Sequence, residues 1–254
     1  MATAFIGTSG YQYDHWKKIF YPDGLPKARW FEFYMSRFAT VEINATFYHL
    51  PKKKTFEQWL ENAPEWFVYT LKYSRYGTHV KKLKDSPETL SRFLENADPL
   101  RPRLGSVLVQ LPPRWNKNAD RLAAFFKAAP PDIRWAVEFR NESWLSEDIF
   151  SILEQNNAAL VVHDHIKPHP ERVTADWTYL RFHGGTVGSG GYSPKKLRSV
   201  ADTIADHLDA GRDVYAYFNN DWDGHALYNA RDLIGLLEDK RKNVLLPAEA
   251  EETT

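Results

Sequence analysis

The sequence predicts an α/β protein that forms one closed (β/α)₈ barrel of the TIM type, and three observations support this. Eight short β-type segments alternate with longer helical segments from one end of the chain to the other. The length of 254 residues matches that of a single eight-fold barrel. No G-x-G-x-x-G turn is present, which argues against a doubly wound dinucleotide-binding sheet.

The predicted strands are rich in Val, Ile, Phe and Tyr and lie between turn residues. They span residues 4–9, 39–44, 66–72, 105–110, 133–140, 158–164, 178–183 and 213–219. Helical segments separate them, so the strands are expected to run parallel to one another.

Helices are predicted between the strands and after the last one. They span residues 26–38, 54–63, 86–98, 118–128, 146–156, 193–210 and 224–240. Ser86 and Ser193 each precede a proline and are predicted helix caps, and Ser143 and Ser146 are alternative caps for the segment 146–156. Two prolines interrupt residues 166–176, so the sixth helix is expected to be reduced or missing.

Composition sets limits on location and chemistry. Residues 1–247 are expected to form a single barrel domain and residues 248–254 an acidic, frayed tail. The 33 basic and 33 acidic residues balance, so there is no overall field that would gather nucleic acid or an anionic membrane. The absence of cysteine excludes disulfides, thiolate metal sites and a thiol nucleophile. With no signal-peptide pattern and no membrane-span segment, we expect a cytoplasmic protein without a membrane partner.

Strand parity predicts where the polar side chains lie. Val41 and Ile43 alternate with polar residues in the second strand, and the fifth and seventh strands repeat this pattern. Because the apolar set must face the helices, the polar set is expected to face the barrel axis. That set comprises Glu42, Asn44, Glu138, Arg140, Arg181 and His183.

Further polar residues end the remaining strands and are expected at the same rim. These are Lys72, Gln110, Asn219 and Asp221, with either His163 or Asp164 according to register. The C-terminal rim is where barrel enzymes carry out their chemistry. The alternative is that the charges of this rim only neutralise one another as buried ion pairs, although such pairs are seldom stabilising overall.

Several ordered motifs run through nearly the whole chain. They are IGTSGYQYDHW (6–16), FYP (20–22), FATVEINATFYHLP (38–51), LGSVLVQLPPRW (104–115), AVEFRNESW (136–144), YLRFHG (179–184) and YAYFNND (215–221), followed by Gly224, Ala226 and Asn229. In these motifs the chain resembles the YecE-like family, also called domain of unknown function 72. The resemblance implies a TIM-type barrel without an established activity. Its similarity to the xylose isomerase and endonuclease IV barrels implies divalent-metal chemistry as one alternative. Asn141 stands where the family commonly has His, so no catalytic role is expected there.

The first functional hypothesis is a hydrolase- or isomerase-like enzyme that uses acid/base chemistry on a small anionic or sugar-like substrate. Its catalytic candidates are Glu42, Glu138 and His183. Its substrate-binding candidates are Asn44, Tyr48, Lys72, Gln110, Arg140, Arg181, Asn219 and Asp221. Alternatively, Glu42 pairs only with Lys72, and Glu138 only with Arg140 or a loop amide.

The loops suggest two further binding features. Residues 184–191 form a glycine-rich stretch that leads to the helix start at Ser193, which indicates either a phosphate site or a surface lid. The tryptophans that follow strand ends either wall the pocket or pack loops over the barrel. They are Trp16, Trp115, Trp144 and Trp222.

Other functional classes stay open. A metal site would draw on Glu138, Asp164, His183 and Asp221, but nearby arginines oppose a cation, and no metal ligand is assigned. The segment 51–84 is basic and contains tyrosines, so it is a candidate nucleic-acid contact or else a solvated face. A non-catalytic ligand-binding or regulatory barrel is the third alternative.

Overall fold

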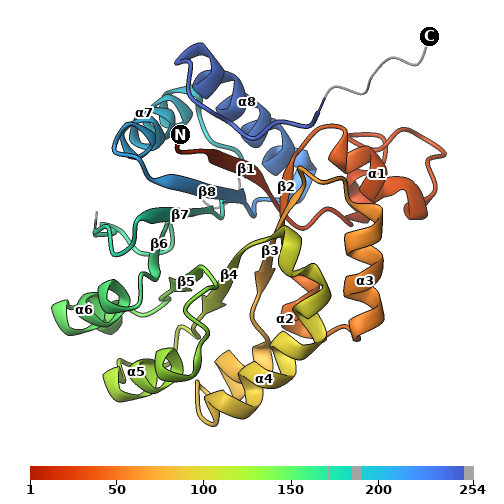
Figure 1. Ribbon diagram of the computed structural model, residues 1–254. Helices are drawn as coiled ribbons and strands as arrows, with labels where there is room; N and C mark the ends of the chain where they lie inside the picture. The colour runs from red at the N-terminus through yellow and green to blue at the C-terminus, as the bar shows by residue number, and fades with distance from the viewer. Residues whose placement is uncertain (171, 185–189, 249–254) are drawn as a thin grey trace.

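Eight parallel strands close into a barrel in chain order, as Figure 1 shows, and this confirms the predicted fold. The computed structural model describes residues 1–170, 172–184 and 190–248. The strands are β1 (Ala4–Ser9), β2 (Thr40–Ile43), β3 (Val68–Lys72), β4 (Leu104–Gln110), β5 (Trp135–Glu138), β6 (Ala159–His163), β7 (Trp177–Phe182) and β8 (Asp213–Phe218). Pairing of β8 with β1, for example Val214 opposite Ala4, closes the sheet.

The helices form a ring outside the barrel. They are α1 (Trp30–Met35), α2 (Ala45–Tyr48), α3 (Lys53–Asn62), α4 (Ser86–Ala97), α5 (Ala119–Ala128), α6 (Glu147–Gln155), α7 (Pro194–Asp209) and α8 (His225–Asp239). A helix was predicted over residues 26–38, but α1 covers only Trp30–Met35, because the first part of that segment forms a 3₁₀ turn at Lys27–Arg29. The described residues between β6 and β7 contain no helix, which confirms the missing sixth helix.

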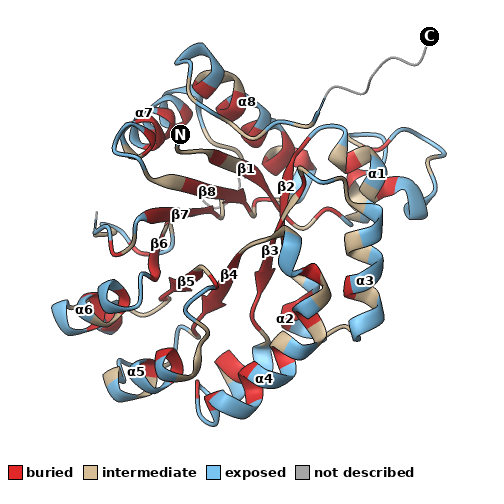
Figure 2. Ribbon diagram, in the orientation of Figure 1, coloured by how far each residue is buried: buried red, intermediate tan, exposed pale blue. Residues whose placement is uncertain are grey.

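The apolar residues form two separate cores, one on each side of the barrel wall. Val41, Ile43, Val137 and Phe139 belong to the outer core between strands and helices. The smaller inner core fills the barrel and contains Leu108, Ala136, Ala159, Val161, Trp177, Tyr179, Tyr215 and Tyr217. In Figure 2 the strands are buried and the helices expose only their outer faces. The expected alternation of strand faces is therefore confirmed.

A layer of hydroxyl groups separates the inner aromatic core from the charged end of the barrel. The Tyr217 hydroxyl lies 2.7 Å from Thr40 Oγ1 and 2.9 Å from Thr70 Oγ1. Thr70 Oγ1 in turn lies 2.8 Å from Ser106 Oγ. Because buried hydroxyls need partners, this closed set satisfies the polar groups beneath the site.

The predicted helix caps differ in outcome. The Ser193 side chain accepts a hydrogen bond from the backbone N–H of Lys196 and caps α7 as predicted. The prediction that Ser86 caps α4 is wrong, because Asp85 occupies the cap position with a φ of 55° and Ser86 is already helical. The Ser86 hydroxyl donates instead to the Leu83 carbonyl. Ser146, rather than Ser143, precedes α6.

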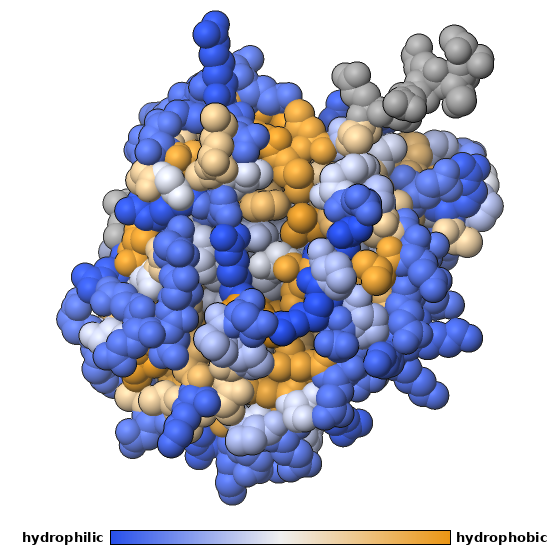
Figure 3. Space-filling view, viewed as in Figure 1, coloured by the Kyte–Doolittle hydropathy of each residue, from blue (hydrophilic) through white to orange (hydrophobic). Residues whose placement is uncertain are grey.

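Hydrophilic residues cover most of the face seen in Figure 3, with apolar surface between them. Among the described residues, no helix has the length and apolar character needed to cross a bilayer. The predicted glycine-rich loop falls largely on residues 185–189, and most of the predicted tail on residues 249–254; both lie outside the described residues.

Candidate functional site

A buried arginine joins two glutamates at the C-terminal end of the barrel. Arg181 donates from Nε and Nη2 to the two carboxylate oxygens of Glu42, at 2.9 and 2.6 Å. Its Nη1 donates to Glu138 Oε2 at 2.7 Å. Arg181 is 1% exposed and both glutamates are fully buried. The three residues that parity placed on the barrel axis therefore do meet there.

These three groups hold one another in their charged states. Burial is the largest single effect and alone would raise the pKa of Glu42 and of Glu138. The positive charge of Arg181, together with the other cationic and hydrogen-bonding partners of each carboxylate, outweighs burial and lowers both pKa values. Burial would likewise lower the pKa of Arg181, whereas Glu42 and Glu138 raise it. At neutral pH the set carries two negative charges and one positive charge.

Protein donors occupy every carboxylate oxygen of the two glutamates. Tyr179 donates its hydroxyl to Glu42 Oε2 at 2.5 Å. Gln110 Nε2 and Arg140 Nη1 donate to Glu138 Oε1 at 2.7 and 3.1 Å. With the bonds from Arg181, no oxygen of Glu42 or Glu138 lacks a donor. Their geometry is thus fixed in advance by the protein.

Lys72 lies beside this network without joining it. Its Nζ lies 4.3 Å from the centre of the Phe47 ring, and the residue is only 7% exposed. Among the described residues, Nζ makes neither a hydrogen bond nor an ion pair, so the alternative in which Lys72 pairs with Glu42 does not hold. Burial and the positive charge of Arg181 lower the pKa of Lys72 to about 8, although Glu42 and Glu138 act in the opposite direction.

Cationic side chains gather around Lys72. The pKa of His79 falls to about 4 because of burial and then the positive charges of Lys72, Arg75 and Arg140. The Arg140 side chain is 23% exposed and uses only Nη1 toward Glu138. Its other donors are therefore available to an anion at the barrel mouth.

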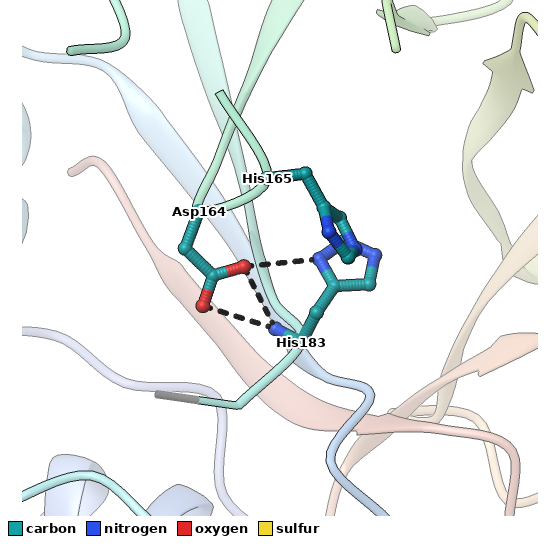
Figure 4. A group of neighbouring side chains, drawn as sticks. All are labelled: Asp164, His165 and His183. Atoms are coloured by element: carbon teal, nitrogen blue, oxygen red, sulfur yellow. Dashed lines mark hydrogen bonds and ion pairs between the residues drawn. The ribbon is translucent and has the colours of Figure 1, made fainter. Parts of the chain in front are cut away.

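His183 connects the buried network to Asp164, and Figure 4 shows its contacts with that carboxylate. His183 Nδ1 lies 3.3 Å from Asp164 Oδ1, and His183 Nε2 lies 3.1 Å from Arg181 Nη1. A guanidinium can only donate, so Nε2 accepts and Nδ1 carries the proton that is donated to Asp164. Asp164 also accepts from the Tyr192 hydroxyl and the His183 backbone N–H. Burial would raise the pKa of Asp164, but these partners lower it to about 2.

Three described residues lie at the spacing of metal ligands. Asp164, His165 and His183 place one ligand atom each within 4.8 Å of one another. A metal on His183 Nδ1 would have to replace its proton, while Arg181 occupies the other ring nitrogen. The wider set suggested by the sequence is not assembled, because the Asp221 carboxylate turns to His15 at 3.4 Å. These residues do not fit a metal as they stand.

The sequence left open whether His163 or Asp164, at the end of β6, reaches the site. His163 Nε2 bonds the Phe139 carbonyl at 2.7 Å, and His163 Nδ1 accepts from the backbone N–H of His165. Burial lowers the pKa of His163 to about 4. His163 therefore supports the backbone, whereas Asp164 reaches the site.

The remaining predicted binding residues lie around the edge. Asn44 donates to the Ser9 carbonyl at 3.3 Å, and its Oδ1 is buried without a hydrogen-bond partner among the described residues. Tyr48 is 66% exposed and touches Phe47 rather than the charged network. Asn219 is half-buried, and its backbone N–H bonds the Phe182 carbonyl.

The structure also shows where the tryptophans after the strand ends, Asn141 and the segment 51–84 lie. Trp16 and Trp144 are fully buried and pack the loops, whereas Trp222 is 71% exposed and stacks on His15. Asn141, the departure from the family motif, accepts from the Ser143 N–H and caps a short turn. In the segment 51–84, the lysines at 52–54 are exposed but Lys72 is buried. Nucleic-acid binding by this segment stays a prediction.

Sequence reasoning missed several residues of the site. Tyr179 has the same parity as Arg181, so the alternation could have identified it. His79 lies in a π-helical turn (Tyr76–Val80) and Phe47 in α2, and neither helical turn was predicted. Parity does not extend into loops, so no signal placed these two side chains beside Lys72.

The chain matches a family model described as protein of unknown function DUF72 over residues 5–254. It is 26% identical to the UPF0759 protein YunF of Bacillus subtilis (strain 168), over 92% of this chain and 94% of that protein. It is 28% identical to the UPF0759 protein YecE of Escherichia coli (strain K12), over 46% of this chain and 43% of that protein.

Solved structures of the same family have the same fold. A DUF72 family protein of Thermotoga maritima MSB8 superposes with a TM-score of 0.82 at 28% identity, covering 93% of this chain and 99% of that one. A DUF72 family protein of Enterococcus faecalis V583 gives a TM-score of 0.76 at 20% identity, with 93% and 96% coverage. The second match supports the fold alone.

Proposed function

The chain belongs to DUF72, a family of proteins of unknown function, and we propose that it is an enzyme that abstracts a proton from a small anionic substrate at the barrel mouth. In this proposal Lys72 is the general base and Arg140 holds the anionic group of the substrate. The Glu42–Arg181–Glu138 set positions and tunes Lys72.

The main support for the proposal is that the amine of Lys72 is buried but not bonded to another described group. It has no hydrogen-bond partner among the described residues, and its pKa of about 8 lies near the pH of the cell. A general base works best when its pKa is close to the operating pH, and buried lysines reach this range by desolvation. No other group of the network combines a free lone pair with such a pKa.

The predicted catalytic residues Glu42, Glu138 and His183 take a positioning role in this account. Each glutamate oxygen accepts at least one bond from the protein, and the His183 Nε2 lone pair faces Arg181. Proton transfer to any of them would break an existing hydrogen bond in a buried place, which is costly. Lys72 accepts a proton without that cost.

The reaction would proceed by transfer of a substrate proton to Lys72 Nζ, which becomes an ammonium group. The electron pair of the broken bond stays on the substrate as a carbanion or enolate. The newly charged Lys72 would stabilise that negative charge at close range, while Arg140 keeps its contact with the anionic group already present on the substrate. Such chemistry is that of an isomerase or lyase step and needs an anionic handle on the substrate.

Deuterium exchange tests the proposal without knowledge of the product. The protein is incubated in D₂O with a panel of phosphorylated and carboxylated metabolites, and mass spectrometry follows the gain of one deuterium. We expect one substrate class to exchange, at a rate that rises with pH and levels off above about 8.

Matched variants assign the roles. Lys72→Met should abolish exchange, whereas Lys127→Met, an exposed lysine at the end of α5, should leave it unchanged. Arg140→Met should raise KM more than it lowers kcat, because it removes a binding group. Lack of exchange across the whole panel, or full exchange by Lys72→Met, would refute the proposal.

A further inference from the structure

The missing sixth helix leaves a cavity on the outside of the barrel wall. Figure 1 shows that β6 and β7 lie between α6 and α7 with only a connecting loop at the perimeter. Beneath this loop lies a cavity of about 900 Å³ between β7 and α7. That volume is typical of sites for small molecules.

The deep part of the cavity is apolar and buried, whereas its rim carries exposed polar residues such as Lys167, Arg172 and Asp206. Ile166, Leu180, Phe182 and Val200 line the deep part and are each 5–8% exposed. A docking face for another protein would leave such side chains open to solvent. A recessed apolar wall with a polar rim favours a small molecule over a macromolecular partner.

Two buried polar atoms in this cavity lack hydrogen-bond partners among the described residues. One is Oγ1 of Thr178, a residue that is 6% exposed, and the other is Nε2 of His169. His169 Nδ1 lies 3.1 Å from the Pro170 carbonyl, so Nδ1 carries the proton and Nε2 can only accept. Buried polar atoms are rarely left unpaired. Both of these atoms can accept a hydrogen bond, so a ligand with an N–H or O–H donor would satisfy them.

One end of the cavity is cationic. Lys196 lines it in the first turn of α7, where the positive end of the helix dipole also favours an anion. Among the described residues, the Lys196 ammonium makes no ion pair. Thr178 and Phe182 lie four residues apart along β7, so the lined stretch of strand is about 13 Å long at roughly 3.3 Å per residue.

We propose that this cavity, which Asp164 and Arg181 of the network also line, is a second binding position, distinct from Lys72 and Arg140, for an elongated amphipathic small molecule. The ligand has an apolar body against Leu180 and Val200, an N–H or O–H donor for Thr178 and His169, and an anionic end at Lys196.

Two fluorescent dyes with the same body test this assignment. 1-Anilinonaphthalene-8-sulfonate has an apolar body, one N–H donor and an anionic group, and N-phenyl-1-naphthylamine lacks only the anionic group. We expect saturable binding of both dyes at one site per chain. Val200→Phe fills the cavity and should weaken the affinity for both by about tenfold or more.

Conservative variants separate ligand binding from folding. Thr178→Val removes one hydrogen bond and should weaken both dyes about three- to tenfold, while the protein stays at least as stable as wild type. Lys196→Met should weaken only the sulfonate dye, by about two- to fivefold. The neighbouring exposed Lys195 does not line the cavity, so Lys195→Met should change neither.

The outcomes also distinguish this site from the barrel mouth. Arg140→Met should leave both dye affinities unchanged, since Arg140 does not line this cavity. Absence of binding to the wild type would overturn the proposal. Unchanged affinities in both Val200→Phe and Thr178→Val, or equal losses in the two lysine variants, would do the same.

Discussion

Arg181 on β7 binds Glu42 on β2 through two parallel hydrogen bonds inside the barrel, at 2.9 and 2.6 Å. The same guanidinium holds Glu138 on β5, so three strands distant in sequence share one buried charge network. Because each glutamate depends on Arg181 for its counter-charge, the network should respond to substitution as a unit.

Substitution of Arg181 should destabilise the protein strongly. Arg181→Met leaves two fully buried carboxylates without their main partner, which typically costs about 3–5 kcal/mol of unfolding free energy. Arg181→Lys should recover only part of this loss, because an ammonium cannot reproduce the bidentate geometry. Urea unfolding measures both, with Arg140→Met as the partly exposed control. A loss in Arg181→Met no larger than that in Arg140→Met would contradict the described geometry.

Acid should remove the stabilisation that Glu138 provides. Its pKa in the folded protein lies well below the ordinary value of 4.5, so the contribution is complete above 4.5 and declines as pH falls below it toward the folded pKa. The difference in unfolding free energy between wild type and Glu138→Gln should therefore shrink below pH 4.5. Glu61→Gln, at an exposed position, is the matched control and should show no comparable trend. A difference that stays constant with pH would argue against a charged Glu138.

Lys72 should cost stability at neutral pH. Its folded pKa of about 8 lies below the ordinary 10.5, so the unfolded chain binds more protons between these values and stability rises with pH across that window. Lys72→Met should be more stable than wild type at pH 7, by about 1–3 kcal/mol. The advantage should narrow between pH 8 and 10.5, as measured by denaturant unfolding. Lys127→Met should show no such advantage. If Lys72→Met is less stable at every pH, the ammonium is better accommodated than the structure indicates.

The histidines at the site should adopt opposite tautomers. Hydrogen-bond geometry gives His183 a proton on Nδ1, toward Asp164, and His163 a proton on Nε2, toward the Phe139 carbonyl. Nitrogen-15 NMR of the imidazole rings distinguishes the two forms, with His183→Asn and His163→Asn for assignment. Finding His183 with its proton on Nε2 would mean that Arg181 does not contact it as described and would reopen the metal alternative.

The sequence was sufficient for the barrel and for the centre of the site. Alternation in β2, β5 and β7 predicted that Glu42, Glu138 and Arg181 share the barrel interior, because side-chain direction in a strand follows from position alone. The loop before β7 was likewise predictable, since Pro168 and Pro170 prevent a helix there.

The details of the site depend on features that sequence patterns do not encode. A pairing of Lys72 with Glu42 was one alternative from the sequence. In the structure, Arg181 and Tyr179 donate to the oxygens of Glu42, and the Lys72 ammonium lies over Phe47. Competition among several cations for one carboxylate is decided by distances, and those are set by the register of strands that close only in the folded barrel. Asp221 lies beyond the end of β8, where strand parity does not fix the side-chain direction, and its carboxylate lies 3.4 Å from His15.

The most direct test of the proposed function is the protonation of Lys72 itself. NMR of ¹³C-labelled lysine side chains, with Lys72→Met to assign the resonance, follows the titration of each ammonium group. We expect a midpoint of about 8 for Lys72. A midpoint at the ordinary lysine value of 10.5 would mean that Lys72 is not a base at neutral pH and would contradict the proposed chemistry.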